Sequence, residues 1–358
     1  MDRRNFIKTS GLAAAATLAA PAIASGAQEL KMVTSWPKNF PGLGTAANRL
    51  AAQIAKATEG RYKVRVYAGG EIVHPLKCLD AVQEGTAELY HSADYYYRGK
   101  NEGLAFFTAV PFGFTANEMD AWIHHGGGQQ VWDELSAGFG VKPLAAGNTG
   151  VQMGGWFRKE IKSIEDLKGL KMRIPGLGGA VMNAIGATAL TLAGAEIMPA
   201  LQSGTIDASE WVGPWNDLAF GFYKVTKHYY YPGFHEPGAQ LTFGISKKLW
   251  DKMSDTDKEI FKAVAAAQNA ISLAEYNANN GAALRTLVEK HGVKLHKFPE
   301  DVFKAFGEAS KDVMSKAGNS TPIAKKVYDS FLKFRKEVIG WTEISDTAYV
   351  QYRNLSKW

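Results

Sequence analysis

The fold class follows from a segment that begins Leu30-Lys-Met-Val-Thr-Ser35 and ends Tyr62-Lys-Val-Arg-Val-Tyr67. Both ends alternate apolar and polar residues, which predicts two strands. Between them, Leu43 to Ala57 carries apolar residues at helical spacing. A helix over 76–84 and a strand over 88–92 are expected next. The order strand, helix, strand, helix, strand is typical of an open α/β sheet with helices on its faces.

A second series of the same kind begins near Val141 and has no Pro/Ser-rich linker before it. We therefore expect two lobes joined by strands that cross directly between them. The strands of this series are expected at 143–147, 151–157, 170–174 and 206–211, and its helices from 163, at 179–185 and at 198–203. From Ser254 onward the pattern predicts helices over 255–289, 302–318 and 322–339, followed by an aromatic and apolar tail over 341–358.

Length and composition exclude several classes of protein. The chain has 358 residues, 46% of them hydrophobic and 21% charged, which excludes intrinsic disorder and suggests about two domains. Its one cysteine, Cys78, excludes a disulfide scaffold and a cysteine-based zinc site. No uncharged apolar run in the body of the chain is long enough to span a bilayer.

The first segment, residues 1–27, is typical of an export signal. It has a basic start with Arg3-Arg4, an apolar middle and small residues at its end. The paired arginines favour the twin-arginine route to the periplasm, with cleavage after Ala24 or Ala27. A membrane anchor or a disordered tail is the alternative. The net charge of +6 would suit nucleic acid, but export argues against that partner.

Three short motifs point to no chemistry. Gly176-Leu-Gly178 opens a predicted helix, but Val181 stands where a dinucleotide-binding fingerprint needs a third glycine. Cys78 lies in an apolar helix, where a buried inert thiol is expected. The side chains of His124 and His125 point apart on a helix, so a shared metal is not expected.

Four groups of residues at predicted strand ends resist a purely structural interpretation. Arg173 ends one strand, where side chains of open α/β folds reach the ligand crevice, and its guanidinium suits a carboxylate. A surface arginine is the alternative. Glu210 and two tryptophans form Glu210-Trp-Val-Gly-Pro-Trp215, and this acid could pair with Arg173 or with a metal ion. The runs 95–97 and 229–236 are rich in tyrosine and suit either a core or a site.

Together these residues resemble a known family. The segments Gly147–Arg158, Gly169–Arg173, Gly204–Trp215 and Tyr229–Gly233 are similar to the periplasmic solute-binding subunits of TRAP (tripartite ATP-independent periplasmic) transporters, especially to members that bind α-keto acids. The resemblance implies a two-lobe periplasmic binding protein fold (type II-like) with hinge strands and a long C-terminal helix. It also implies delivery of the cargo to a membrane permease driven by an ion gradient.

The resemblance also implies roles for single residues. Arg173 would grip the carboxylate of the cargo, and Gln152 would touch both cargo and a cation. Glu210, the backbone carbonyl of Trp211 and Glu236 would complete the cation site. Oxygen donors of this kind suit a hard cation such as Na⁺ or Ca²⁺. The cation would reverse the repulsion between two glutamates and an anionic cargo.

Some positions depart from the family pattern or leave a choice open. Tyr96 is expected to donate its hydroxyl to the carboxylate, although the run 95–97 offers three tyrosines. Trp215 stands where another aromatic residue is expected, and it is assigned to the cargo pocket. Phe234-His235 replaces an expected Trp-Trp pair, which would enlarge or polarise the pocket.

The expected domain organisation follows from the resemblance. Lobe I would comprise 28–149 plus about 239–280, and lobe II 150–238 plus about 281–321. The helical extension 322–358 could exchange between two subunits of a dimer, or fold back on its own chain.

The expected cargo is a small monocarboxylate, a 2-oxo or 2-hydroxy acid, bound with a cation. The alternatives are a dicarboxylate or a sugar acid, or an exported metal-dependent hydrolase or lyase with Glu210 and Glu236 as ligands. The sequence offers no convincing activated nucleophile or general base, so no enzymatic activity is expected.

Overall fold

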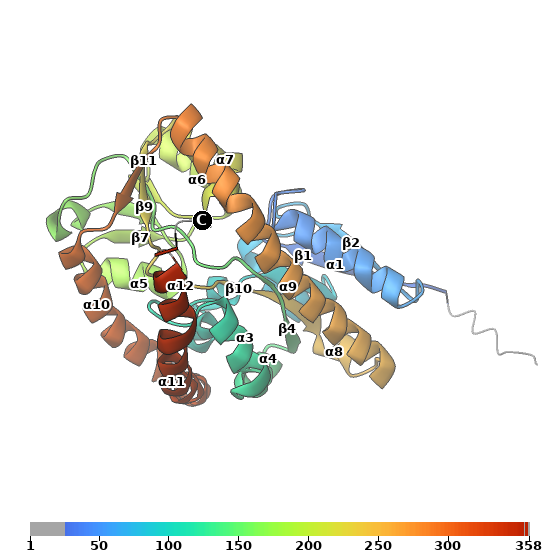
Figure 1. Cartoon of the computed structure of the whole chain (residues 1–358). Helices are drawn as coiled ribbons and strands as arrows, with labels where there is room; N and C mark the ends of the chain where they lie inside the picture. Colours follow the sequence, from blue (N-terminus) through green and yellow to red (C-terminus); the bar gives the residue numbers. More distant parts are fainter. Residues whose placement is uncertain (1–25, 354, 357–358) are drawn as a thin grey trace, which may run out of the picture.

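The computed structural model describes residues 26–353 together with 355 and 356 (Figure 1). The predicted export signal therefore lies outside the described residues, apart from its last two positions. The described chain forms two mixed sheets with helices around them, which confirms the predicted α/β class. No helix within this described part is both long enough and apolar enough to cross a membrane.

The first sheet has the strand order β2-β1-β3-β10-β4. β1 runs parallel to β2 and to β3, and α1 and α2 connect these strands as predicted. β10 was not expected from the sequence, although it lies between β3 and β4 and pairs with both in antiparallel fashion. The elements are β1 Gln28–Thr34, α1 Gly44–Ala57, β2 Tyr62–Tyr67, α2 Cys78–Gln83, β3 Leu89–Ser92, β4 Val141–Asn148 and β10 Gln240–Ser246.

The second sheet has the order β11-β9-β5-β8-β6-β7 and is built from strands of two to four residues. Two of its helices begin earlier than predicted, α5 at Gly176 and α6 at Gly194, and the helix expected from 163 is only a short 3₁₀ helix, Ile164–Leu167. The tyrosine run that begins at Tyr229 forms β9. The elements are β5 Gly155–Phe157, β6 Lys171–Arg173, α5 Gly176–Ala184, β7 Thr188–Leu190, α6 Gly194–Ser203, β8 Ala208–Ser209, α7 Pro214–Phe220, β9 His228–Tyr231 and β11 Lys294–Lys297.

Two predicted strands of this sheet are each four residues shorter than expected, and the one expected over 170–174 keeps Lys171–Arg173. The strand expected over 151–157 begins only at Gly155, because the preceding backbone bonds to other loops: the amide of Gln152 donates to the carbonyl of Glu236 (3.0 Å) and that of Met153 to Val212 (3.0 Å). The strand expected over 206–211 keeps only Ala208–Ser209. Both segments leave the sheet where they approach the candidate site.

From Asp255 onward the described chain is helical apart from β11, as predicted. The 31-residue helix α9 packs on α1 and β4 toward one end and on α7 toward the other, so it links the two sheets (Figure 1). α11 packs on α4 of its own chain, which matches the alternative of a helix folded back. The remaining helices are α3 Ala116–His125, α4 Gly128–Ala137, α8 Lys247–Trp250, α9 Asp255–Arg285, α10 Glu300–Gly318, α11 Pro322–Thr342 and α12 Ala348–Arg353.

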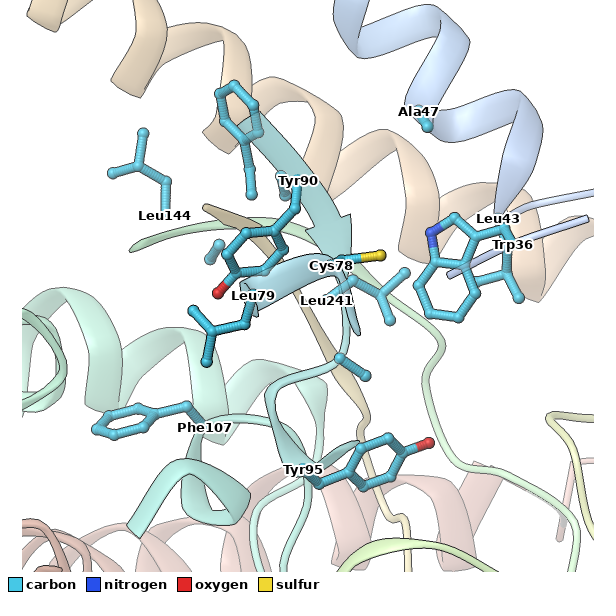
Figure 2. Close-up of a cluster of buried hydrophobic side chains, with 14 of the residues drawn as sticks. Trp36, Leu43, Ala47, Cys78, Leu79, Tyr90, Tyr95, Phe107, Leu144 and Leu241 are labelled. Carbon is cyan, nitrogen blue, oxygen red and sulfur yellow. The ribbon is translucent and has the colours of Figure 1, made fainter. Parts of the chain in front are cut away.

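The larger hydrophobic core surrounds the first sheet. The ring of Phe107 stacks between Trp122 (5.3 Å between centroids) and Trp132 (5.0 Å). Figure 2 shows another part of this core, with Trp36 on one side and Phe107 on the other. Cys78 is buried in it, which confirms the expected burial, and burial raises the pKa of its thiol to about 12.

Candidate functional site

Arg173 ends β6 and is fully buried, with a relative exposure of 0%. Its Nε donates to the carbonyl of Leu192 (3.1 Å), and its Nη1 donates to the carbonyl of Glu210 (3.2 Å) and pairs with the Glu210 carboxylate. The guanidinium also lies over the ring of Trp211, 5.0 Å from its centroid. The surface-arginine alternative is therefore wrong, and a fixed positive charge faces the interior.

The register of two parallel strands brings Arg173 and Glu210 together. Arg173 of β6 is opposite Ser209 of β8, and the amide of Glu210 donates to the carbonyl of Arg173 (3.2 Å). Glu210 follows β8 directly, so both side chains leave the sheet at the same edge. This is the edge where ligands bind in open α/β sheets.

Gln152 is tied to the loop that carries Glu236. Besides the bond between the Gln152 amide and the Glu236 carbonyl, the amide of Gly233 donates to the carbonyl of Gln152 (2.9 Å). A Cβ on Gly233 would lie only 2.7 Å from that carbonyl oxygen, so the close approach requires glycine. The Gln152 side-chain nitrogen donates to Thr149 Oγ1 (3.0 Å), which leaves its Oε1 facing the site.

Several buried oxygens of this site have no hydrogen-bond partner within the described residues. They are Gln152 Oε1, Glu210 Oε2 and both carboxylate oxygens of Glu236. Buried polar atoms are normally paired, so this group of oxygens fits a bound cation. Burial and the neighbouring Glu210 raise the pKa of Glu236 well above its usual range, against the opposing effect of Arg173.

A small cavity adjoins these oxygens. Tyr96 and Gln152 line it from the polar side, and Trp36 and Trp211 form aromatic walls. The Tyr96 hydroxyl accepts from Arg173 Nη2 at 3.4 Å, and burial raises its pKa, so the hydroxyl keeps its proton. The remaining lining residues are Leu43, Tyr95, Thr149, Val212, Ala239 and Leu241.

The structure shows which of the three tyrosines at 95–97 contacts Arg173. Tyr97 donates its hydroxyl to Ser92 Oγ (2.8 Å) inside the core, away from Arg173. The ring of Tyr95 packs on Tyr96 with its hydroxyl directed away from Phe107 (Figure 2). Tyr96 is the tyrosine whose hydroxyl bonds to Arg173.

One predicted site residue lies apart from the others, and one lining residue was missed. Trp215 is not among the residues that line this cavity; its ring packs on Tyr276 of α9 (5.5 Å between centroids). Trp36 was not expected at the site. Trp36 directly follows Ser35, the last residue of the first expected strand. Its Nε1 donates to His91 Nδ1 (2.7 Å). The sequence signal that could have identified Trp36 as a site residue is its position directly after the end of a strand.

Comparison with known proteins decides the family. Residues 32–321 match the DctP model, described as bacterial extracellular solute-binding protein, family 7. The chain belongs to this family. DctP proteins are solute-binding subunits of TRAP transporters, so the predicted resemblance is confirmed over most of the chain.

Three relatives of the DctP chain are informative. It is 40% identical to a monocarboxylate 2-oxoacid-binding periplasmic protein of Nostoc sp. (strain PCC 7120), over 100% of both chains. A TRAP solute-binding protein of Bordetella bronchiseptica, a mixed-occupancy dimer with copurified calcium and picolinate, is 38% identical with a TM-score of 0.90, covering 92% of this chain and 98% of that one. One from Pseudoalteromonas atlantica, with bound sodium and pyruvate, is 35% identical with a TM-score of 0.88, covering 91% and 99%. These matches confirm the two-lobe binding-protein fold.

Proposed function

We propose that this DctP protein captures a small monocarboxylate in the periplasm and delivers it to the membrane permease of a TRAP transporter. The cargo is a 2-oxo acid such as pyruvate or a 2-hydroxy acid such as lactate, bound with Na⁺ or Ca²⁺. The observation that carries the proposal is the buried guanidinium of Arg173, next to the Tyr96 hydroxyl and the unpartnered oxygens of Gln152, Glu210 and Glu236.

The residues divide into a cargo side and a cation side. Arg173 and Tyr96 bind the carboxylate, because a guanidinium and a protonated hydroxyl both donate hydrogen bonds to it. Glu210, Glu236, the Trp211 carbonyl and Gln152 Oε1 hold the cation, and Gln152 reaches both sides. The cation supplies positive charge between two glutamates and an anion, which would otherwise repel each other. Trp215 as a cargo contact stays a prediction.

The two lobes close over the cargo by hinge motion. Lobe I comprises 28–149 plus about 239–280, and lobe II comprises 150–238 plus about 281–321. The two sheets support this assignment, because each is built only from strands of one lobe. Hydrogen bonds join the lobes: Asn216 Nδ2 donates to the carbonyl of Pro41 (3.0 Å), and Arg98 Nη1 donates to the carbonyl of Gly176 (2.7 Å). The protein returns its ligand unchanged, as a binding subunit and not an enzyme.

Export and assembly complete the proposal. Residues 1–27 direct the chain to the periplasm by the twin-arginine route. The far end of the extension 322–358 joins two copies, since it exposes Trp341 (67%), Ile344 (73%) and Tyr352 (71%), while the first part of α11 packs on its own chain. Exposed apolar side chains grouped in one segment are typical of an interface.

A thermal-shift panel on the purified full chain tests the cargo. Pyruvate and lactate should raise the melting temperature when Na⁺ or Ca²⁺ is present, and less so in a Na⁺-free buffer with a chelator, which removes both ions. Stabilisation by dicarboxylates or sugar acids alone would contradict the monocarboxylate assignment. Nuclear magnetic resonance of the incubated acid should show no product; consumption of the acid would favour a hydrolase or lyase.

A further inference from the structure

His235 occupies an unusual place beside the proposed cation site. It lies between Phe234 and Glu236 in the loop from β9 to β10, with a relative exposure of 1%. The Phe234 ring lies 5.3 Å from its imidazole, and a Cβ on Gly178 would come within 2.6 Å of its Cβ. The imidazole is therefore held in place by α5 and by its own loop.

Both nitrogens of this imidazole are buried and find no hydrogen-bond partner in residues 26–353. Such a group costs about 1–3 kcal/mol unless something else satisfies it. Its nearest charged neighbour is Glu210, whose Oε2 lies 3.4 Å from His235 Nε2 and is itself unpartnered. The unpartnered nitrogen and oxygen thus face the same small space.

The geometry of this space suits a metal ion. One ligand atom from each of Glu210, His235 and Glu236 lies within 4.8 Å of the others. Metal–nitrogen and metal–oxygen bonds of about 2.1 Å place two ligands about 3.0 to 4.2 Å apart, so small side-chain adjustments bring all three to one ion. His235 is not among the residues that line the cargo cavity, and its imidazole lies against the carboxylates of Glu210 and Glu236 instead.

We propose that His235 is a nitrogen ligand of the cation and extends the range of this site to divalent first-row transition ions. Na⁺ and Ca²⁺ take oxygen ligands, whereas imidazole favours ions such as Co²⁺ and Zn²⁺. Two carboxylates and one imidazole form a mixed donor set that such ions bind well. This inference rests on the proposed cation site but not on the identity of the cargo.

The test uses Co²⁺ as a probe of the chelator-stripped full chain. Co²⁺ should bind with visible absorption bands, and His235→Gln should weaken this binding about tenfold or more, because it replaces the nitrogen by an amide oxygen. Ca²⁺ affinity should change by less than about threefold, since the amide oxygen is a good Ca²⁺ ligand. Equal Co²⁺ affinity and spectra in wild type and His235→Gln would overturn the proposal.

A second pair of histidines provides the control. His228 Nδ1 lies 3.0 Å from His296 Nε2 where β9 meets β11, so it can capture Co²⁺ by itself. The wild type and His235→Gln are therefore compared in a His228→Gln background. In that background, pulsed electron paramagnetic resonance of bound Mn²⁺ should detect an imidazole nitrogen, and its absence would contradict the proposal whether or not the His235 variant folds.

The outcomes separate this inference from the proposed function. If Ca²⁺ binds but His235→Gln leaves Co²⁺ binding unchanged, the inference is overturned and the proposed function stays intact. Failure of Na⁺, Ca²⁺ and Co²⁺ alike to bind, with pyruvate still bound, would overturn the cation part of the proposed function and the inference with it.

Discussion

At the residue scale, removing the hydroxyl of Tyr96 should affect cargo binding, whereas removing that of the adjacent Tyr97 should affect stability. Tyr96→Phe removes the hydroxyl next to Arg173, and hydrogen bonds to charged groups contribute about 1.5–3 kcal/mol, so pyruvate affinity should fall about 10- to 150-fold. Tyr97→Phe removes a hydroxyl bonded to Ser92 and should lower stability by about 1 kcal/mol while affinity is kept. Calorimetry and urea unfolding measure the two effects; weaker affinity in Tyr97→Phe alone would reverse the assignment.

Asp94 makes stability depend on pH. Its carboxylate accepts from Tyr90 (3.0 Å) and from Trp132 Nε1 (2.8 Å), and burial raises its pKa to about 6. The folded state holds this proton more tightly than the unfolded state, whose pKa is about 3.9. The stabilisation is therefore complete below about pH 4 and lost as the pH rises through about 6, a change of about 3 kcal/mol.

Asp94→Asn should remove this dependence. Between pH 4 and 7.5, the difference in unfolding free energy between the variant and the wild type should shift by about 3 kcal/mol in favour of the variant. Urea unfolding at several pH values measures it, with Asp255→Asn as a control because that carboxylate is 100% exposed. If the difference in unfolding free energy between Asp94→Asn and the wild type were the same at every pH, the buried carboxyl would not titrate in this range.

At the element scale, α11 is part of the main core. Phe331 has a relative exposure of 0%, and its ring lies 4.4 Å from Phe114 and 5.6 Å from Phe106. Phe331→Ala should cost about 3–5 kcal/mol of unfolding free energy. The neighbouring Leu332→Ala, with 39% exposure, should cost much less. Similar losses in both variants, measured by urea unfolding, would show that the helix does not pack as described.

The elements also explain what the sequence could predict. β1 and β2 were predictable because alternating residues mark strands with one buried face, and α9 because of its long periodic pattern. β10 was missed because six of its seven residues are buried, so it has no alternation. β5 was predicted too long because the residues before it bond to loops distant in sequence, and β8 because regular pairing on both sides is limited to Ala208 and Ser209.

The site could be predicted only in part, because some of its features depend on contacts between segments that are distant in sequence. Arg173 and Glu210 were found because each ends a strand, a position that sequence marks. Trp36 was missed although it follows a strand end, because its place beside Trp211 depends on how the two lobes come together. Trp215 does not line this cavity, since its ring packs on Tyr276 of α9, a contact that the sequence does not mark. The sequence marks His235 as a departure from the family pattern, but only the three-dimensional structure shows that its nitrogens have no hydrogen-bond partner among the described residues.

At the scale of the whole molecule, the exposed apolar end of the chain predicts a dimer. Wild-type protein should have twice the monomer mass in light scattering after size exclusion. The double variant Ile344→Glu, Tyr352→Glu should be a monomer, because both side chains are more than 70% exposed and would carry charge into the interface. A monomeric wild type would contradict the dimer.

The central claim concerns the whole binding event: a buried guanidinium neutralises the carboxylate of a trapped monocarboxylate beside a cation. Calorimetric titration of pyruvate into wild type and Arg173→Ala, both with Ca²⁺ present, tests it most directly. Truncating one partner of a buried charge pair costs about 2–5 kcal/mol, so the variant should bind roughly 30-fold to several thousand-fold more weakly. Equal affinity for pyruvate in both proteins would contradict the account.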